Sequence, residues 1–344
     1  MNYAIILAGG FGRRFWPLSK VFQPKQFLSI GTNSSMLEET LSRIKNFIPC
    51  ANIFIATNKL YRLKIKEISR RFNIANSNLL FEPRARNTLS SVGYLTYQIQ
   101  KKDKEAVVFV FPSDHYIKGK RKFINLLKKA AYLAKTKGLI VTFGIKPKRP
   151  ETGYGYLKIA ISGRINSKVY KVEKFIEKPP LNRTKRFIKD KRYYWNSGIF
   201  VFRAKTILEE IKKYTPFTYR IIQRIKNKKD IKRIWHNFPD ISLDKAVMMK
   251  TDKIAMFAST FGWVDLGSWC AVEEIMKKDK NQNISKGRHI DLGSKNILVW
   301  STQKPILTLG LRNLVIIDTK EGLLVCAKDK AQEVKNIVKK ISYH

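Results

Sequence analysis

Short apolar runs alternate with longer amphipathic stretches over the first 145 residues. Apolar runs bounded by polar residues predict strands at 4–7, 52–56, 79–82, 107–111 and 139–143. Stretches in which apolar residues recur every three to four positions predict helices at 36–47, 59–72, 88–101 and 121–137. This β-α-β-α order predicts an α/β fold built on a doubly wound, mostly parallel, Rossmann-like sheet.

The pattern changes twice towards the C-terminus. Between residues 150 and 280, predicted strands that look antiparallel lie between helices, at 155–160, 169–176 and 198–202. After residue 285, short β segments at 297–300, 306–309, 314–318 and 323–327 lead into a terminal helix at 331–341. We therefore predict a large α/β domain over residues 1–283 and a small β-helix-like unit with a final helix over residues 284–344.

A glycine-rich loop follows the first predicted strand, at a place where open α/β sheets bind their ligands. Three glycines in the segment 9–12 let backbone N–H groups approach an anion, and arginines follow at 13 and 14. The loop lacks the Gly-Lys-Ser/Thr of a Walker A motif. It also lacks the acidic residue of a dinucleotide fingerprint, since the first acid in the chain is Glu38. The loop suits a polyphosphate, and an ordinary glycine-rich turn is the alternative.

Asp114 follows the most apolar predicted strand, and the only other aspartate in the first 150 residues is Asp103. A carboxylate in that place either caps the next segment or binds Mg²⁺. Because a polyphosphate needs a divalent ion to bridge its oxygens, we favour the metal ligand. Asp265 lies between tryptophans and glycines in the segment 262–269 and could complete a metal site, whereas His115 is expected to be structural.

Two further polar segments lie at the edges of predicted strands. Glu177 and Lys178 place an acceptor and a cation side by side before a proline pair. Asn196 lies in a polar turn that enters an apolar strand. An exposed ion pair is the alternative interpretation of the first segment.

The charge of the chain bears on its partners. The 344 residues contain 68 Lys+Arg and 26 Asp+Glu, which gives a net charge of +42. The net charge is +21 over residues 1–150, +15 over 151–270 and +6 over 271–344, so it is spread along the chain. Because a nucleic-acid-binding arm or tail would concentrate its charge, we expect no dedicated nucleic-acid partner. An anionic ligand agrees with such a surface.

The compartment follows from what the sequence lacks. No apolar run approaches the length of a membrane span, and the N-terminus lacks the basic region and long apolar stretch of a signal peptide. The three cysteines are scattered and fit neither a disulfide framework nor a metal site. We therefore expect a cytoplasmic protein without a membrane partner.

Taken together, the motifs resemble those of the sugar-phosphate nucleotidyltransferases, most closely the mannose-1-phosphate guanylyltransferases. The resemblance covers roughly residues 3–270, and residues 314–341 are similar to the C-terminal β unit and helix of the single-function enzymes. The matching segments occur in the family's order, at 7–12 with Arg14, 16–19, 24–26, 82–83, 86–88, 112–115, 152–156, 175–179, 195–198 and 265–269.

The resemblance implies roles for individual residues. Nucleotide-binding residues would be Leu7, Ala8, Gly9, Gly10, Gly12, Glu82, Arg86, Asn87 and Thr88. Arg14 and Lys25 would hold the triphosphate and the departing pyrophosphate, and Lys178 would meet the sugar phosphate. Asp114 and Asp265 would bind Mg²⁺, and Gly153, Glu177 and Asn196 would face the sugar hydroxyls.

The reaction that the resemblance implies is Mg²⁺-dependent transfer of GMP from GTP to α-D-mannose 1-phosphate, which gives GDP-mannose and pyrophosphate. Three residues depart from the family pattern. Arg13 stands where a small hydroxyl residue is common, Lys245 where a tyrosine is expected, and Met249 where a glutamate is expected. Arg13 adds charge beside the phosphates, and the other two put sugar-side contacts in doubt. A homodimer is one oligomeric state that we retain.

Three alternatives stay open. The first is the same chemistry on another hexose 1-phosphate or nucleotide. The second is a bifunctional enzyme that also isomerises mannose 6-phosphate, which we set aside because the chain is too short for the extra metal-binding barrel that this would require. The third is a basic RNA-binding or regulatory protein on this scaffold, which predicts the loss of Lys25, Asp114 or Lys178, although all three are present.

Overall fold

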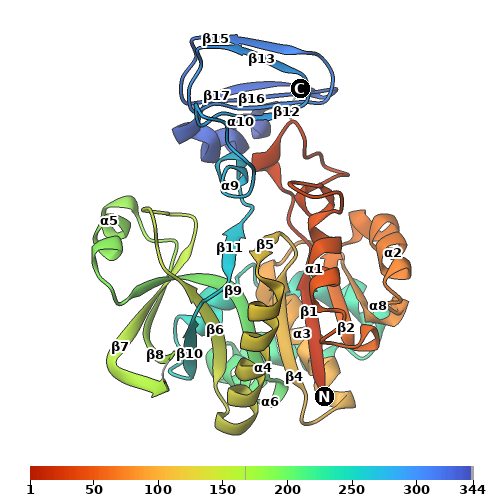
Figure 1. The fold of residues 1–344 in the computed structure, drawn as a ribbon. Helices are drawn as coiled ribbons and strands as arrows, with labels where there is room; N and C mark the ends of the chain where they lie inside the picture. The colour runs from red at the N-terminus through yellow and green to blue at the C-terminus, as the bar shows by residue number, and fades with distance from the viewer. Residues whose placement is uncertain (167, 342–344) are drawn as a thin grey trace. The chain divides into compact units, whose positions relative to one another are not determined.

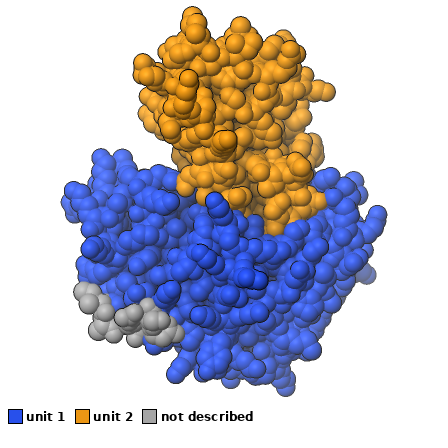
Figure 2. Space-filling model, viewed as in Figure 1, with its two compact units in different colours: residues 1–9, 41–112, 117–263 blue, residues 10–40, 113–116, 264–344 orange. Residues whose placement is uncertain are grey.

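The computed structural model describes residues 1–166 and 168–341. The chain divides into two compact units, shown in different colours in Figure 2. Unit 1 contains residues 1–9, 41–112 and 117–263, and unit 2 contains residues 10–40, 113–116 and 264–344. The predicted domain limits at residues 283 and 284 stay a prediction, because these units follow spatial packing rather than chain order.

Unit 1 is built on one nine-stranded sheet with the order β3-β2-β1-β4-β9-β6-β10-β8-β7. The strands are β1 (Asn2–Leu7), β2 (Ile53–Asn58), β3 (Leu79–Glu82), β4 (Val107–Pro112), β6 (Ile140–Ile145), β7 (Gly155–Asn166), β8 (Val169–Glu177), β9 (Tyr193–Arg203) and β10 (Ile254–Ala258). Strands β3, β2, β1 and β4 pair in parallel, as do β6 and β10. The doubly wound α/β class predicted from the sequence is thereby confirmed.

The sheet contains less parallel pairing than the sequence predicts. Strand β9 lies between β4 and β6 and runs antiparallel to both, and the pairs β7–β8, β7–β9 and β8–β10 are also antiparallel. The apolar pattern of 198–202 marks only the centre of β9, because its start at Tyr193 is polar and aromatic. Strand β10 was not predicted, although it is an apolar run that pairs with β6.

Helices cover both faces of the sheet of unit 1 (Figure 1). They are α2 (Arg62–Arg71), α3 (Asn87–Lys102), α4 (Lys120–Lys137), α5 (Leu181–Lys189), α6 (Ala204–Tyr214), α7 (Pro216–Arg224) and α8 (Lys228–Ile234), while α1 (Met36–Ile44) belongs partly to each unit. Val108 and Val110 of β4 join the core with α3 and α6. The ring of Phe111 contacts Phe123 of α4, with the ring centroids 6.3 Å apart. Because neighbouring residues of a strand point to opposite faces, β4 is buried on both sides, which explains its uninterrupted apolar sequence.

Unit 2 contains a small β-helix-like domain. Strands β12 (Ile284–Lys286), β14 (Leu298–Ser301), β16 (Leu314–Thr319) and β17 (Gly322–Ala327) form one sheet, and β13 (His289–Leu292) pairs with β15 (Ile306–Leu309). The pairs β12–β14, β14–β16 and β13–β15 are parallel, as expected for successive turns of a β-helix. Short helix α9 (Trp269–Val272) and C-terminal helix α10 (Val334–Ile341) complete the unit.

The core of unit 2 joins segments that are far apart in the chain. Trp269 of α9 contacts both Phe15 and Trp300, with ring centroids 5.1 Å and 5.7 Å apart. The Trp269 indole N–H also donates to the carbonyl of Trp16 at 3.1 Å. The glycine-rich segment after residue 10 is therefore packed against the same core as the β-helix strands.

Two short strands that the sequence did not predict carry the chain between the units. Strand β5 (His115–Lys118) pairs with β11 (Gly262–Asp265), and the chain passes from one unit to the other within each of them. Asp114 directly precedes β5, and Asp265 is the last residue of β11. Over the described residues 1–166 and 168–341, every helix is too short or too polar to cross a membrane.

Candidate active site

Unit 2 brings the two predicted metal ligands together. One ligand atom of each of Asp114, His115 and Asp265 lies within 4.8 Å of those of the other two. The amide N–H of Leu266 donates to the carbonyl of Asp114 at 3.2 Å, which fixes the ends of β5 and β11 against each other. His115 was expected to be only structural, and it lies buried beside both carboxylates.

Lys25 lies within the same cluster. The residue opens a short 3₁₀ turn, Lys25–Phe27, and its Nζ forms an ion pair with Oδ2 of Asp114. Burial lowers the pKa of Lys25, but the carboxylates of Asp114 and Asp265 outweigh burial and hold the pKa above its ordinary value. Lys25 therefore stays charged in a place where an anionic ligand would meet it.

The two carboxylates are affected in opposite directions. Burial opposes ionisation of Asp114, yet the charges of Lys25 and His115 outweigh it and hold the pKa below its ordinary value. Burial raises the pKa of Asp265, and the Asp114 carboxylate adds to that increase. Because the two carboxylates share one lysine, an additional cation at this place would stabilise their charged forms.

This donor set suits Mg²⁺. Magnesium is commonly held by one or two carboxylates together with the phosphates of a substrate, because it prefers oxygen ligands. Asp114 and Asp265 supply such oxygens, and a divalent cation would offset the burial and the repulsion from Asp114 that together raise the pKa of Asp265. The residues present therefore fit the metal that the sequence predicts.

The glycine-rich loop is held in a shape that only glycine adopts readily. Gly12 has φ +65°, and a Cβ at this position would lie 2.6 Å from the backbone N of Lys25. The Ser19 hydroxyl donates to the Gly12 carbonyl at 2.7 Å and fixes the turn. The close approach of Gly12 thus sets the position of Lys25.

Arg14 follows this turn and has an unsatisfied donor. Its Nε is buried and lacks a hydrogen-bond partner within residues 1–166 and 168–341. Its charge acts on both Lys25 and Asp265, which places the guanidinium near the acidic cluster. A buried cationic donor without a partner is a natural contact for an anion.

The beginning of the loop belongs to unit 1. Leu7 ends β1, and the backbone of Ala8 is fixed because its N–H donates to Ala56 and its carbonyl accepts from Thr57, both at 2.8 Å. Beyond Ala8 the chain is open. Around Gly10, a Cβ would meet no atom of the described residues within 4 Å, and for Gly9 the nearest atom is 3.9 Å away.

Glu82 is buried at the end of β3, where it was predicted to face the nucleotide. The Ser91 hydroxyl donates to its Oε1 at 2.5 Å. Burial raises the pKa of Glu82 to about 7, against the opposing hydrogen bonds from Ser91 and the backbone of Arg86. The carboxyl group can therefore hold a proton at neutral pH and donate a hydrogen bond.

Arg86 and Thr88, which lie after the β3 turn, form hydrogen bonds with the segment 236–243. Arg86 donates from its guanidinium to the carbonyl of His236, and Thr88 Oγ1 accepts from the N–H of Leu243 at 2.9 Å. Asn87 has φ +58°, a conformation that asparagine tolerates. Strand β3 and the start of α3 thus form one ordered edge of unit 1.

A second group of predicted residues meets where β6, β7, β8 and β9 run side by side. Gly155 pairs with Glu177 in the β7–β8 register, and a Cβ on Gly155 would lie 2.9 Å from Oε2 of Glu177 and 3.4 Å from Cβ of Asn196. Asn196 Oδ1 accepts from the Thr142 hydroxyl at 2.8 Å. Gly155 therefore leaves the room in which the Glu177 carboxylate and the Asn196 amide lie together.

Lys178 forms an ion pair with Glu177, with Nζ 2.8 Å from Oε1. Its φ of +46° is unusual for a residue with a long side chain, and strain of this kind is often found at functional positions. Gly153, predicted to face the sugar, directs its N–H to the Glu151 carboxylate at 2.9 Å instead. The glycine that lies between Glu177 and Asn196 is Gly155.

Asp244 is a site candidate that the sequence analysis did not single out. Burial raises its pKa to about 7, and the nearby Glu177 carboxylate adds to the increase. The sequence did carry an indirect signal, because Asp244 directly precedes Lys245, one of the departures from the family pattern. Its closeness to Glu177 depends on the fold and could not be read from the sequence.

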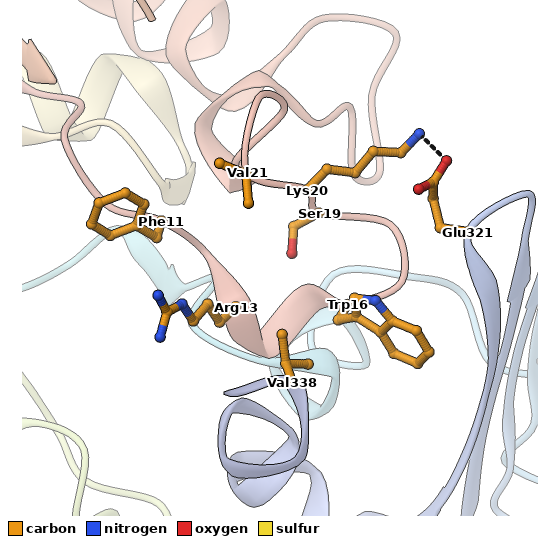
Figure 3. A pocket seen from close by; sticks show the side chains of 8 residues that line it. All are labelled: Phe11, Arg13, Trp16, Ser19, Lys20, Val21, Glu321 and Val338. Atoms are coloured by element: carbon orange, nitrogen blue, oxygen red, sulfur yellow. Dashed lines mark hydrogen bonds and ion pairs between the residues drawn. The ribbon is translucent and has the colours of Figure 1, made fainter. Parts of the chain in front are cut away.

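Arg13 lines a pocket that contains neither Asp114 nor Lys25. The pocket has a volume of about 250 Å³ and is lined by Phe11, Arg13, Trp16, Ser19, Lys20, Val21, Glu321 and Val338 (Figure 3). The Arg13 guanidinium lies 5.8 Å from the centre of the Phe11 ring. Arg13 therefore lines this pocket, and its predicted place beside the phosphates stays a prediction.

A family model described as nucleotidyl transferase matches residues 3–282. The chain belongs to the nucleotidyl transferase family. A second model, for the MannoseP isomerase/GMP-like beta-helix domain, matches residues 287–341 and agrees with the parallel strand pairs of unit 2.

Two relatives match this nucleotidyltransferase over most of its length. It is 36% identical to a mannose-1-phosphate guanylyltransferase of Escherichia coli, over 97% of this chain and 74% of that protein. It is 35% identical to the alginate biosynthesis protein AlgA of Pseudomonas aeruginosa, over 97% of this chain and 71% of that protein.

Solved structures agree with the fold. A crystal structure named mannose-1-phosphate geranyltransferase, from Thermus thermophilus, matches with a TM-score of 0.89 at 30% identity, over 99% of both chains. One named mannose-6-phosphate isomerase, from Helicobacter pylori, matches with a TM-score of 0.62 at 30% identity, over 77% of this chain and 99% of that one. The nucleotidyltransferase fold with a β-helix-like C-terminal part is therefore shared along the whole chain.

Proposed function

We propose that this nucleotidyltransferase transfers GMP from GTP to α-D-mannose 1-phosphate and releases pyrophosphate, with GDP-mannose as the sugar product. The observation that carries the proposal is the pair Asp114–Asp265 beside Lys25, in a chain that is 36% identical to a mannose-1-phosphate guanylyltransferase over 97% of its length. The arrangement offers both the cationic and the metal-binding groups that a reaction between two anions requires.

The residues of unit 2 serve the phosphates. Lys25 and Arg14 contribute positive charge to the triphosphate and to the departing pyrophosphate, and the open backbone after Ala8 donates N–H groups to phosphate oxygens. Asp114 and Asp265 would hold Mg²⁺, which when bound supplies the charge that offsets repulsion between the two substrates.

The residues of unit 1 serve the base and the sugar. Glu82, with a pKa of about 7, and the edge formed by Arg86, Asn87 and Thr88 contact the guanosine part of GTP. On the sugar side, the Glu177 carboxylate accepts hydrogen bonds from hydroxyl groups, and the Asn196 amide donates hydrogen bonds to them. Lys178 contacts the sugar phosphate. We add Asp244 to this group because its raised pKa lets it donate a hydrogen bond at neutral pH.

The chemistry needs no general base from the protein. A sugar phosphate is largely dianionic at neutral pH, because the second pKa of a phosphate monoester is about 6. One of its oxygens bonds to the α-phosphorus of GTP while the bond from that phosphorus to the oxygen bridging the β-phosphate breaks, and the electron pair leaves with pyrophosphate. Positioning and charge stabilisation then supply the rate.

A panel of substrates tests the proposal. Pyrophosphate release is measured with each of four nucleoside triphosphates against mannose, glucose and galactose 1-phosphates, with Mg²⁺ and after chelation by EDTA. We expect the highest kcat/KM for GTP with mannose 1-phosphate, and loss of turnover in EDTA that Mg²⁺ restores. A different preferred pair, or no turnover with GTP and mannose 1-phosphate, would overturn the assignment.

The same preparation is assayed for two further properties. Conversion of mannose 6-phosphate to fructose 6-phosphate is measured because one similar structure carries the name of that isomerase. The oligomeric state in solution is measured by light scattering, since the homodimer stays a proposal. The cytoplasmic location is likewise a proposal.

A further inference from the structure

In the β13–β15 pair of unit 2 the outward side chains are apolar and the inward ones are polar, the reverse of an ordinary surface strand. Ile290 and Leu292 of β13 are 64% and 71% exposed, and Leu307 and Leu309 of β15 are 70% and 71% exposed. The register pairs Ile290 with Leu307 and Leu292 with Leu309, so the four side chains share the outward face. In Figure 1 this pair forms the edge of unit 2 farther from α10, with the four-stranded sheet between them. We call these four residues the aliphatic face.

The inward side of the same two strands is polar. His289 Nε2 lies 2.9 Å from the Thr308 hydroxyl, which donates to Oδ1 of Asp291 at 2.6 Å. His289 Nδ1 lies 2.6 Å from the Ser285 hydroxyl, and the N–H of Ser294 donates to Asp291 at 3.3 Å. This network fixes the register, because a slip by one residue would expose the whole network and bury the aliphatic face. The outward position of the aliphatic residues is therefore built into the fold.

Positive charge flanks the aliphatic face at both ends. Exposed Arg288 and Lys304 precede the two strands, and the backbone N–H of Ile306 donates to the Arg288 carbonyl at 2.9 Å. Exposed Lys295 and Arg312 follow the strands and are joined by an isolated parallel bridge. Residues 285–317 contain five Lys or Arg residues and a single acid, which is the inward Asp291.

We propose that the aliphatic face docks on the surface of an anionic lipid bilayer. An exposed patch of large aliphatic side chains marks an interaction site. Burial of apolar area at the headgroup boundary, together with attraction between Lys or Arg and anionic headgroups, is the combination that holds peripheral proteins on membranes. This surface offers both, and no helix among residues 1–166 and 168–341 is long and apolar enough to cross the bilayer.

Charge and side-chain chemistry favour a lipid bilayer at the aliphatic face over a second copy of the chain, a nucleic acid or a specific protein partner. A second copy of the chain would bring the same four cations to the same face, so self-association would have to overcome repulsion between like charges. The face presents no aromatic side chain on which a nucleic-acid base could stack. The outward positions are all aliphatic and offer no polar group for a directional contact, which suits a fluid apolar medium better than a specific protein partner. The sequence predicted no membrane partner, because neither a spanning segment nor a signal peptide was found, and a surface patch of this kind is visible only in the fold.

Vesicle binding of the full chain tests the proposal. Co-sedimentation is measured with vesicles of phosphatidylcholine alone and with vesicles containing about 30% phosphatidylglycerol, a composition that supplies the anionic headgroups. Four proteins are compared: the wild type, the double variant Leu292→Ser/Leu309→Ser, the charge variant Lys295→Gln/Arg312→Gln, and a control. The control is Leu323→Ser/Val325→Ser on the outer side of β17, where the exposed fractions are 59% and 55%. Pyrophosphate release and thermal unfolding verify that each variant is folded.

We expect the wild type and the control to bind the anionic vesicles, and the Leu292→Ser/Leu309→Ser variant to bind at least about tenfold more weakly. The charge variant Lys295→Gln/Arg312→Gln should weaken binding by about fivefold for each charge removed. Raising the salt concentration from about 0.1 M to about 0.5 M should also weaken binding, because it screens the attraction to the headgroups.

Two results would overturn the proposal. One is equal binding by the wild type and the Leu292→Ser/Leu309→Ser variant, or no binding by either. The other is a dimer, seen by sedimentation velocity without lipid, that is lost in this variant and strengthened by salt, with no vesicle binding. That result would assign the aliphatic face to self-association.

Discussion

Replacement of Gly12 by alanine tests whether the glycine-rich loop positions Lys25. At φ +65° an alanine carries a backbone cost of about 1–2 kcal/mol. Its Cβ would also lie 2.6 Å from the Lys25 backbone N, where ordinary contact begins at 3.4 Å. The loop and the Lys25 turn would therefore have to move apart by the difference between 2.6 Å and 3.4 Å, about 0.8 Å.

A displacement of that size falls on the residue that neutralises Asp114. Misplacement by about 1 Å can cost on the order of 100-fold in rate when a reaction depends on positioning. We therefore expect Gly12→Ala to lower kcat for pyrophosphate release by roughly 10- to 100-fold. Unfolding should become easier by only a few kcal/mol, because the strain is local.

Gly138→Ala is the matched control for this variant. Gly138 follows α4 with φ +63°, and its Cβ would lie no closer than 3.9 Å to another atom, at Thr206 Oγ1. It carries the same backbone cost without the overlap. Steady-state kinetics and thermal unfolding are measured for both variants. Equal kcat values for Gly12→Ala and Gly138→Ala would refute the claim that the close approach at Gly12 positions Lys25.

Three further variants probe the sugar side. Gly155→Ala should raise KM for mannose 1-phosphate by roughly tenfold with little change in KM for GTP, because its Cβ would displace the Glu177 carboxylate; an equal rise in both would contradict that role. Lys178→Ala should also raise KM for the sugar phosphate, since an exposed cation is lost, and an unchanged KM would remove Lys178 from the site. Asp244→Asn should stabilise the protein at pH 8 but not near pH 4. The pKa of Asp244 is about 7 in the folded protein, above its value in the unfolded chain, so the wild type loses stability as the pH rises from the unfolded to the folded pKa, and the asparagine variant does not. Thermal unfolding of the Asp244→Asn variant across this range checks the sign, and a difference from the wild type that does not vary with pH would contradict it.

The sequence predicted the elements whose apolar pattern is local. Strands 79–82 and 306–309 have the predicted limits, and the helix predicted at 121–137 begins one residue earlier, at Lys120. Strands β5 and β11 were missed because each is short and contains or adjoins polar site residues. The antiparallel insertion of β9 could not be foreseen either, since it depends on pairings between segments nearly 100 residues apart, such as Val107 with Arg203.

The residues of the candidate site likewise fall into those that the sequence predicted and those that only the fold reveals. The glycine loop, Lys25, Asp114 and Asp265 could be proposed from residue type and from their places after strands. What the sequence could not supply is electrostatic context. The raised pKa of Asp244 arises from burial and from Glu177, which lies 67 positions earlier in the chain. The room for Glu177 beside Asn196 likewise depends on the register that places Gly155 between them.

The most direct test of the account is the turnover of Asp114→Asn with GTP, mannose 1-phosphate and Mg²⁺. The matched control is Asp103→Asn, which removes an aspartate that is ion-paired to the chain terminus at 2.6 Å, away from the cluster. We predict that Asp114→Asn lowers pyrophosphate release by on the order of 100- to 1,000-fold while its thermal unfolding stays near that of the wild type. Asp103→Asn should keep full activity. Near-wild-type turnover by folded Asp114→Asn would contradict the claim that the Asp114–Asp265 pair organises the transfer.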